Sequence, residues 1–269
     1  MKYLAGCMVL FCFCIQAEPQ RIITLSPHLT EWVYSLGLQE RLVAVSAHSN
    51  YPPEAQSLPI VADYNGADIA AIVALEPDLI LAWQGGNKPQ DISRLSTLGY
   101  KLYLSSPHRP EDIARELDEV SQLLGTSAQS RSLTDDFLKQ LQALRQRYHR
   151  EAPLDAFYYL WSHPLMTVGE QAWANQLLKV CGAQSLFSDS AVDYPQVSVQ
   201  QVLRRQPDVL IAASQANKKS LETFWQPHRQ VLSAPLIVTD PDKLSRYTLR
   251  LLPALSTLCD QLHNHASQP

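Results

Sequence analysis

One pattern occurs twice in the chain, as IVALEPDLILA at residues 72–82 and, about 130 positions later, as VLRRQPDVLIA at residues 202–212. Each copy contains an apolar pair, three variable positions, the dipeptide Pro-Asp and a run of aliphatic residues. Proline cannot continue a helix, and a short run of branched residues after a turn is typical of a buried strand. Each copy therefore predicts a unit made of a helix, a turn and a strand.

Two further similarities lie outside the repeated pattern. Residues 32–37 resemble residues 177–182, and Tyr51-Pro52 has a counterpart in Tyr194-Pro195. A period of about 130 residues is too long for a solenoid, whose repeats have about 20–50 residues, and it matches the size of an ordinary domain. The sequence therefore predicts two similar lobes with a cleft between them.

Strands and helices alternate in both halves, which is typical of α/β lobes with mostly parallel, Rossmann-like sheets. Ser26 and Thr30 followed by Glu31 indicate the start of a helix. The expected strands are residues 21–25, 42–45, 79–82, 101–104, 156–161, 209–212 and 236–239, and the other expected helices are residues 69–75, 92–98, 113–124, 172–180, 199–203 and 248–263.

The longest helical pattern lies between the two halves. Leu133, Phe137, Leu141, Leu144 and Tyr148 follow one another at spacings of four and three, which places them on one helix face. Residues 126–152 contain no proline or glycine, so we predict a rigid helix of about 24 residues, roughly 35 Å long, that joins the lobes. The expected division is a lobe at 18–127, the linking helix at 128–150 and a lobe at 151–269. The alternative is an ordinary surface helix of one domain.

Residues 1–17 have the features of a secretory signal peptide. One lysine precedes an apolar run that is short for a membrane span, and Ala17 stands at the expected cleavage point. The alternative is a membrane anchor or a buried first helix. The net charge of −4 and the pI near 6.0 give no basic surface for nucleic acid, and no second apolar run is long enough to cross a bilayer. We therefore expect a soluble exported protein.

The cysteines predict one disulfide. Cys7, Cys12 and Cys14 lie in the segment that is expected to be removed, which leaves Cys181 and Cys259. Because disulfides persist in exported proteins, we predict that these two are bonded. The bond would close a loop of about 80 residues and contribute about 4 kcal/mol of stability on the chain-entropy model. The alternative is two buried free thiols.

No signature of a catalytic site is present. The sequence has no Gly-x-Ser-x-Gly, no P-loop, no Gly-x-Gly-x-x-Gly and no His-Glu-x-x-His pattern. Aromatic residues stand instead at expected strand-to-loop junctions, where a cleft would hold a large planar ligand. The alternative for each ring is core packing. These residues are Tyr51, Tyr64, Trp83, Trp161 and Tyr194.

The eight histidines are scattered singly, with none at a short metal-ligand spacing, so we predict no metal site. Four of them, His28, His48, His108 and His163, stand near expected strand ends. Asp242 and Arg246 are four residues apart in an expected loop before the last helix. They form either a local salt bridge or a pair presented to polar groups of a ligand.

Several motifs carry a resemblance to one family. They are IITLSP at 22–27, YPP at 51–53, the repeated pattern at 72–81, AWQGGN at 82–87, VCG at 180–182 and YPQVS at 194–198. With these motifs the chain resembles the periplasmic cobalamin-binding proteins of ABC importers, whose lobes are joined by a rigid helix. The resemblance covers essentially the whole mature chain. It implies a receptor that holds a corrinoid between its lobes and delivers it to a permease of the inner membrane.

The resemblance also implies ligand-contacting positions. His48 stands where the family usually has tyrosine, Tyr64 and Tyr194 where it has tryptophan, and Met166 where it has phenylalanine. The complete implied set is His48, Tyr64, Trp83, Met166, Tyr194, Asp242, Lys243, Leu244, Ser245 and Arg246. Trp83, Asp242 and Arg246 keep the side chains expected from the family.

The family docks to its permease through one glutamate on each lobe, and those positions hold Ala70 and Gln200 in this chain. Asp68, two residues before Ala70, is the acidic residue that can replace the first glutamate. No acidic residue stands near Gln200. The resemblance thus implies docking at these positions with a different set of side chains.

Together these observations predict a non-catalytic, monomeric solute-binding protein of the periplasm, with cobalamin or a related corrinoid as its ligand and no cofactor. One alternative in the same fold is a receptor for haem or a ferric siderophore, with His48 or Tyr64 as an axial iron ligand. The alternative from another class is a secreted hydrolase, for which the sequence offers no nucleophile and base.

Overall fold

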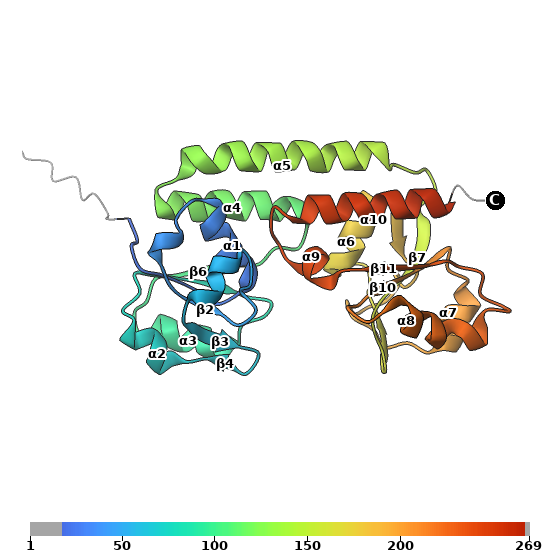
Figure 1. The fold of residues 1–269 in the computed structure, drawn as a ribbon, viewed down its shortest axis with the longest axis horizontal. Coiled ribbons are helices and arrows are strands. Elements are labelled where there is room, and N and C mark those ends of the chain that lie inside the picture. Colours follow the sequence, from blue (N-terminus) through green and yellow to red (C-terminus); the bar gives the residue numbers. More distant parts are fainter. Residues whose placement is uncertain (1–17, 267–269) are drawn as a thin grey trace, which may run out of the picture.

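The computed structural model describes residues 18–266 of the chain. The predicted signal peptide, residues 1–17, lies outside the described residues. Two β-sheets, each flanked by helices, form two lobes that lie side by side, and a layer of long helices runs along one side of both (Figure 1). The predicted α/β class with two Rossmann-like lobes is confirmed.

The first lobe contains a six-stranded sheet in the order β4-β3-β2-β1-β5-β6. All neighbours in it are parallel except β3 and β4. Its elements are β1 (Ile22–Thr24), α1 (Pro27–Ser35), the 3-10 helix η1 (Gln39–Arg41), β2 (Leu42–Ser46), the 3-10 helix η2 (Pro53–Ser57), β3 (Ile60–Asp63), β4 (Gly66–Ala67), α2 (Ile69–Ala74), β5 (Leu79–Trp83), α3 (Pro89–Thr97) and β6 (Leu102–Ser105).

The second lobe contains a five-stranded sheet in the order β11-β10-β7-β8, with β9 also paired to β7. Strand β8 is antiparallel to β7, and the other pairs are parallel. Its elements are β7 (Leu154–Ser162), β8 (Leu165–Thr167), α6 (Trp173–Val180), β9 (Ala183–Ser185), α7 (Val199–Arg205), β10 (Val209–Ala213), α8 (Lys218–Trp225), the 3-10 helix η3 (Gln226–His228), β11 (Leu236–Thr239) and α9 (Pro241–Ser245).

The two lobes share a core strand order. In the first sheet β2, β1, β5 and β6 lie side by side in that order. In the second sheet β9, β7, β10 and β11 lie side by side in the corresponding order, with β7 in the place of β1. Helices α1 and α6 are both followed by a glycine in the left-handed region, Gly37 at φ 70° and Gly182 at φ 69°. A residue with a Cβ is disfavoured there, which explains why the sequence similarity of these two segments ends on glycine.

The Pro-Asp pattern acts in the same way in both lobes. Asp78 accepts a hydrogen bond from the amide of Arg21 (2.9 Å), and Asp208 accepts one from the amide of Asp155 (2.7 Å). Each aspartate thereby ties the start of its strand to the start of the first strand of the lobe. The residues before the prolines, Glu76 and Gln206, have positive φ values of 47° and 49° and end the preceding helix. The predicted helix–turn–strand units are confirmed.

Three long helices form the layer beside the lobes: α4 (Pro110–Leu124), α5 (Ser127–Arg147) and α10 (Leu251–Ala266). Figure 1 shows α4 and α10 end to end and α5 lying along both. Thr134 donates to Asp118 of α4 (3.2 Å), and Tyr148, just after α5, donates to Asp260 of α10 (2.5 Å). Helix α5 therefore contacts both helices and spans both lobes.

The predicted disulfide is present. Cys181, at the end of α6, is bonded to Cys259 of α10, with a Cα–Cα distance of 4.7 Å. Both residues lie in the largest hydrophobic cluster of the second lobe, where Phe137 and Leu141 of α5 also pack. The bond joins the sheet-covering helix α6 to the helical layer.

The structure differs from the sequence prediction in several elements. Strands β3, β4, β8 and β9 and helix α8 are not predicted, because most of them are too short for a periodic pattern. Helix α5 has 21 residues rather than about 24. Residues 242–246 are not a simple loop, since α9 covers most of them, and its Asp240 N-cap accepts from the amide of Asp242.

Candidate ligand-binding cleft

A hollow of about 420 Å³ lies between the two lobes at the carboxyl ends of the parallel strands, where open α/β sheets place their ligands. Both lobes contribute side chains to it. The lining residues are Trp83, Gly85, Ser106, Pro107 and His108 from the first lobe, and Gln171, Ala172, Trp173, Asp193, Tyr194 and Tyr247 from the second.

Trp83, the last residue of β5, is held by the loop that follows it. Its amide donates to the Asn87 side chain (2.7 Å), which in turn donates to the carbonyl of Leu25 after β1 (2.8 Å). The Trp83 ring lies against the backbone of Gly85 and Gly86, and a Cβ at Gly86 would overlap it. The AWQGGN motif is therefore a seat that holds one indole in place.

A row of aromatic rings crosses from the first lobe to the second. Tyr247 is 5.6 Å from Trp83 and 4.5 Å from Trp173, centroid to centroid, and meets both edge to face. The Trp173 indole donates to the carbonyl of Leu244 (2.7 Å). Edge-to-face contact is a favoured arrangement of aromatic pairs and links the three rings into one surface. Trp83 and Tyr247 are only partly buried, so this floor of the cleft can meet a broad planar ligand.

A buried polar chain lies behind the cleft in the first lobe. The two ring nitrogens of His28 are 2.8 Å from the Ser26 hydroxyl and 3.0 Å from the Ser105 hydroxyl, and Ser105 donates to Glu116 (2.6 Å). Burial lowers the pKa of His28 to about 3, and burial raises the pKa of Glu116. A neutral histidine with such a low pKa is a poor proton acceptor, and all four side chains are buried. These four side chains therefore satisfy one another's hydrogen bonds inside the lobe, and their role is structural.

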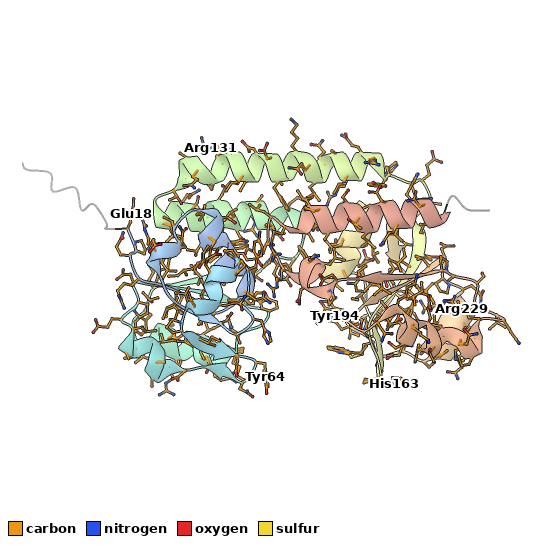
Figure 2. The ribbon with its side chains drawn as sticks, in the orientation of Figure 1. Glu18, Tyr64, Arg131, His163, Tyr194 and Arg229 are labelled. Carbon is orange, nitrogen blue, oxygen red and sulfur yellow. A yellow bond between two sulfur atoms is a disulfide. The ribbon has the colours of Figure 1, made fainter. Side chains whose placement is uncertain are left out.

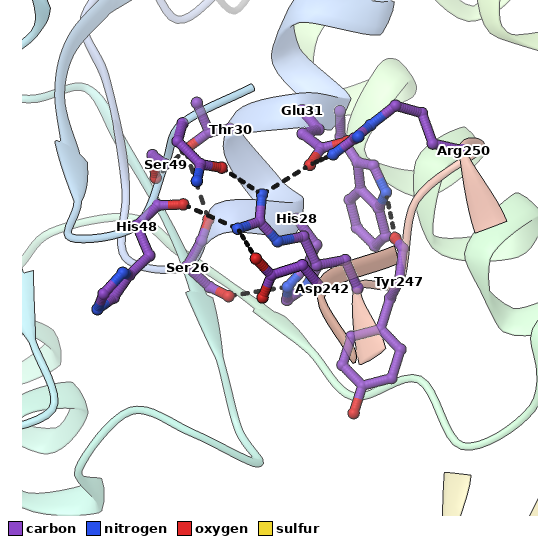
Figure 3. A network of polar contacts seen from close by, with 12 residues as sticks. Ser26, His28, Thr30, Glu31, His48, Ser49, Asp242, Tyr247 and Arg250 are labelled. Atoms are coloured by element: carbon purple, nitrogen blue, oxygen red, sulfur yellow. Dashed lines mark hydrogen bonds and ion pairs between the residues drawn. The ribbon is translucent and has the colours of Figure 1, made fainter. Parts of the chain in front are cut away.

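A second polar network joins the lobes directly (Figure 3). Glu31 of α1 accepts from Arg250 (2.5 and 2.8 Å) and from Arg246 (3.3 Å), both in the second half of the chain. The Glu31 carboxylate raises the pKa of Arg250. Arg246 also donates to the Asn50 side chain (2.7 Å) and to the carbonyl of His48 (3.3 Å). The side chain of Glu31 is only 4 % exposed, so this is an ion-pair cluster inside the lobe interface.

The positions predicted from the resemblance lie on both lobes. His48 and Tyr64 are exposed on the first lobe, and Tyr64, at 89 %, is the most exposed. Tyr194, on the second lobe, lines the hollow together with Trp83. Figure 2 places Tyr64 at the end of the first lobe that is remote from the helical layer. Only Trp83 and Tyr194 of the predicted set line the central hollow.

The predicted polar segment 242–246 divides into different roles. Asp242, Lys243 and Ser245 are exposed. Leu244 is 2 % exposed and packs in the core of the second lobe, so its side chain does not face the cleft. Arg246 is already engaged with Glu31, because the fold brings the residue that follows α9 next to α1.

Apart from His108, which the sequence places near a strand end, the remaining site residues are not found by sequence reasoning. Trp173 and Tyr247 look like ordinary helix and loop residues, and Glu31 looks like part of a helix-start motif. Their contacts join positions up to 219 residues apart. The sequence feature that points to one of them is the position of Trp173 at the start of a predicted helix, directly after a predicted loop.

The predicted docking residues occupy matching places on the two lobes. Ala70 lies in the first turn of α2 and Gln200 in the first turn of α7, and both are exposed. Their helices are capped by Asp68 and Ser198, whose side chains accept from the amides of Ala71 and Gln201. Both helices thus present an exposed first turn.

The described part of the chain lacks two features of other classes of protein. Within residues 18–266 no group of three or more histidine, cysteine, aspartate or glutamate side chains is arranged to hold a metal ion. No helix in that part of the chain has both the length and the apolar character needed to cross a membrane.

Two lobes, a helical layer across them and an aromatic hollow between them define a two-lobed solute-binding protein. Residues 22–229 match the model of the periplasmic binding protein family. The chain belongs to this family.

Comparison with individual proteins narrows the relationship. The chain is 38% identical over 257 residues to the vitamin B12-binding protein of Pectobacterium carotovorum, covering 94% of this chain and 92% of that protein. It is similar to the crystal structure of the periplasmic vitamin B12-binding protein BtuF of Vibrio cholerae, with a TM-score of 0.84, 35% identity and coverage of 93% and 99%. The periplasmic haem-binding protein HutB of Vibrio cholerae has a TM-score of 0.78 at 20% identity, with coverage of 91% and 99%, and shares the fold.

Proposed function

We propose that this protein binds cobalamin or a related corrinoid between its lobes and delivers it to an ABC-type permease of the inner membrane. The observation that carries the proposal is the row Trp83, Tyr247 and Trp173 across the cleft, in a chain related at 35–38% identity to vitamin B12-binding proteins. Aromatic faces held in a cleft suit a broad, largely apolar macrocycle.

The residues have different proposed roles. Trp83 supplies the main stacking surface, because its seat against Gly85 and Gly86 fixes the ring. His48, Tyr64, Met166 and Tyr194 border the ligand. Asp242, Lys243 and Ser245, whose side chains are exposed, meet the amide groups at the rim of the corrin. Arg246 mainly holds the two lobes together, and Leu244 supports the core.

The same proposal includes the surroundings of the protein. It is exported by a signal peptide at residues 1–17, works in the periplasm as a monomer and has no catalytic activity. The lobes, proposed as residues 18–127 and 151–269 with the linking helix at 128–150, meet the permease through the first turns of α2 and α7. Asp68 supplies the acidic group on the first lobe. Its carboxylate is exposed although it accepts from the Ala71 amide.

Ligand titration tests the function against its alternatives. We expect calorimetry to give one saturable site for cobalamin and no specific site for haemin. A Soret band that appears with haemin and disappears in His48→Ala or Tyr64→Phe would favour the haem alternative instead. Turnover of model esters that depends on Ser26 or His28 would favour a hydrolase.

A further inference from the structure

One exposed tryptophan has no role in the cleft described so far. Trp161 stands at the carboxyl end of β7, in the hairpin with β8, and is 61 % exposed. Trp32, Trp173 and Trp225 are at most 8 % exposed. An indole with this much exposed apolar surface contributes to binding when a ligand covers it.

The strand register decides which way Trp161 faces. Tyr159 pairs with Thr167, whereas Trp161 pairs with Met166, so Leu160 is the extra residue of a bulge. Tyr159 packs in the same hydrophobic cluster as Leu165, on the face of the sheet that α8 covers. Because side chains alternate along a strand and a bulge adds one step, Trp161 shares the opposite face with Met166.

That opposite face leads into the cleft. Val168, two residues after Met166, packs in the cluster that contains Trp173 and is flanked by Tyr247. Met166 also forms a bridge with Gln196, and the amide of Thr167 donates to the carbonyl of Pro195 (3.0 Å). The segment that carries Tyr194, which lines the hollow, therefore lies directly beside β8 and its Met166.

The hairpin is supported from behind, so the indole is presented by a fixed element. His163, at the turn of the hairpin, meets Phe224 of α8 edge to face at 5.5 Å. A separate hollow of about 400 Å³, which Trp161 also borders, lies between the hairpin and α8. Figure 2 shows His163 at the end of the second lobe remote from the helical layer, as Tyr64 is on the first lobe. Support of this kind lowers the ordering cost of a contact.

We infer that Trp161 is a ligand-contacting residue that stacks on an exposed planar face of the bound corrinoid at the mouth of the cleft, on the lobe opposite Trp83. This inference rests on the proposed function. It adds an exposed indole to the second lobe, whose other tryptophan in the cleft, Trp173, is buried in the floor.

Calorimetry with cyanocobalamin tests the inference. Trp161→Ala is expected to weaken binding about ten- to thirtyfold, and Trp161→Phe, which keeps an aromatic face, about threefold or less. Leu98→Ala is the matched control, because Leu98 is 53 % exposed at the end of α3. Its affinity is expected to equal that of the wild type. Melting temperatures confirm that all three variants fold.

Oxidative footprinting by mass spectrometry gives a second readout on the unmodified protein. Cyanocobalamin is expected to protect Trp161 from oxidation. If the wild type binds the ligand but Trp161 stays reactive and Trp161→Ala binds equally well, the inference is wrong and the proposed function stands. If the wild type does not bind any corrinoid, the proposed function and the inference both fall.

Discussion

The two lobes have the same core strand order but different interiors. The first lobe and helix α4 beside it bury one imidazole and two carboxyl groups, those of His28, Glu31 and Glu116. The buried polar side chains of the second lobe's described residues, such as Thr167 and Asn175, are neutral, and that lobe carries the disulfide.

The shared strand order and the different interiors of the two lobes have different physical origins. The strand order follows from the repeated helix–turn–strand unit, which acts through backbone hydrogen bonds to Asp78 and Asp208. The interior can be satisfied either by hydrogen-bonded polar chains or by apolar packing with a covalent link. The difference teaches that a change in pH should act mainly on the first lobe, and a reductant on the second.

Removal of the disulfide is expected to have the largest effect. The double variant Cys181→Ser/Cys259→Ser should lower the free energy of unfolding by about 4 kcal/mol, because the open chain gains entropy when unfolded. Hydrogen exchange should accelerate most in α6 and α10. Equal acceleration in β1 and β5 of the first lobe would break the comparison.

Disruption of the interlobe ion cluster is expected to cause the second largest loss of stability. Glu31→Gln leaves Arg246 and Arg250 without their buried partner and should cost about 3 kcal/mol, a fall of roughly 6–12 °C in melting temperature for a chain of this size. Glu222→Gln is the control, since Glu222 is 51 % exposed in its pair with Lys218. Its stability should change by less than about 0.5 kcal/mol. Similar losses in both variants would contradict a special role for Glu31.

The stacking surface of the first lobe is tested by Trp83→Ala. Cobalamin binding should weaken about thirty- to a hundredfold, because the burial of one indole face contributes about 2–3 kcal/mol. Asp242→Ala should cost about 1 kcal/mol, as expected for one exposed hydrogen bond. Calorimetry on both variants gives the comparison. Unchanged affinity in Trp83→Ala would mean that the ring is structural.

Acid is expected to destabilise the wild type through His28. Burial lowers the pKa of His28 from about 6.5 to about 3, so below pH 6.5 the unfolded chain binds a proton that the folded chain does not. This contribution is complete above pH 6.5 and is lost as the pH falls, by about 2 kcal/mol between pH 6.5 and 5. Glu116, with its raised pKa, acts in the opposite sense.

Denaturant unfolding of the wild type and of His28→Gln over this pH range separates the two groups. Glu116 is present in both proteins, whereas His28 is present only in the wild type. The wild type should therefore lose more stability than the variant as the pH falls. Parallel curves would show that His28 does not titrate as the buried chain implies.

The smallest expected effects compare the two copies of the Pro-Asp pattern. Asp78 accepts from two amides, those of Gln20 (2.8 Å) and Arg21 (2.9 Å), whereas Asp208 accepts from the amide of Asp155 (2.7 Å). At about 1 kcal/mol for each hydrogen bond, Asp78→Ala should cost about 2 kcal/mol and Asp208→Ala about 1 kcal/mol. Urea unfolding measures both, and equal losses would show that the two copies are energetically equivalent.

Much of the fold could be predicted from the sequence. The helices α4 and α5 have clear periodicity, β5 and β10 are apolar runs that follow a Pro-Asp pair, and the Trp83 seat is visible as a Gly-Gly pair after a strand. The short strands β3, β4, β8 and β9 have too few residues for a pattern. Their positions depend on neighbouring strands that are distant in the chain.

The sequence by itself determined the two lobes, the helix across them and the bonded cysteines. Periodicity and Pro-Asp turns depend on residues that are close in the chain, and the number of cysteines depends only on composition. Only the tertiary structure decided how the lobes meet. Arg246 reaches Glu31 across 215 residues, and a bulge at Leu160 turns Trp161 toward the face of Met166. Side-chain direction and long-range ion pairs depend on the register and packing of the folded chain, which no local pattern encodes.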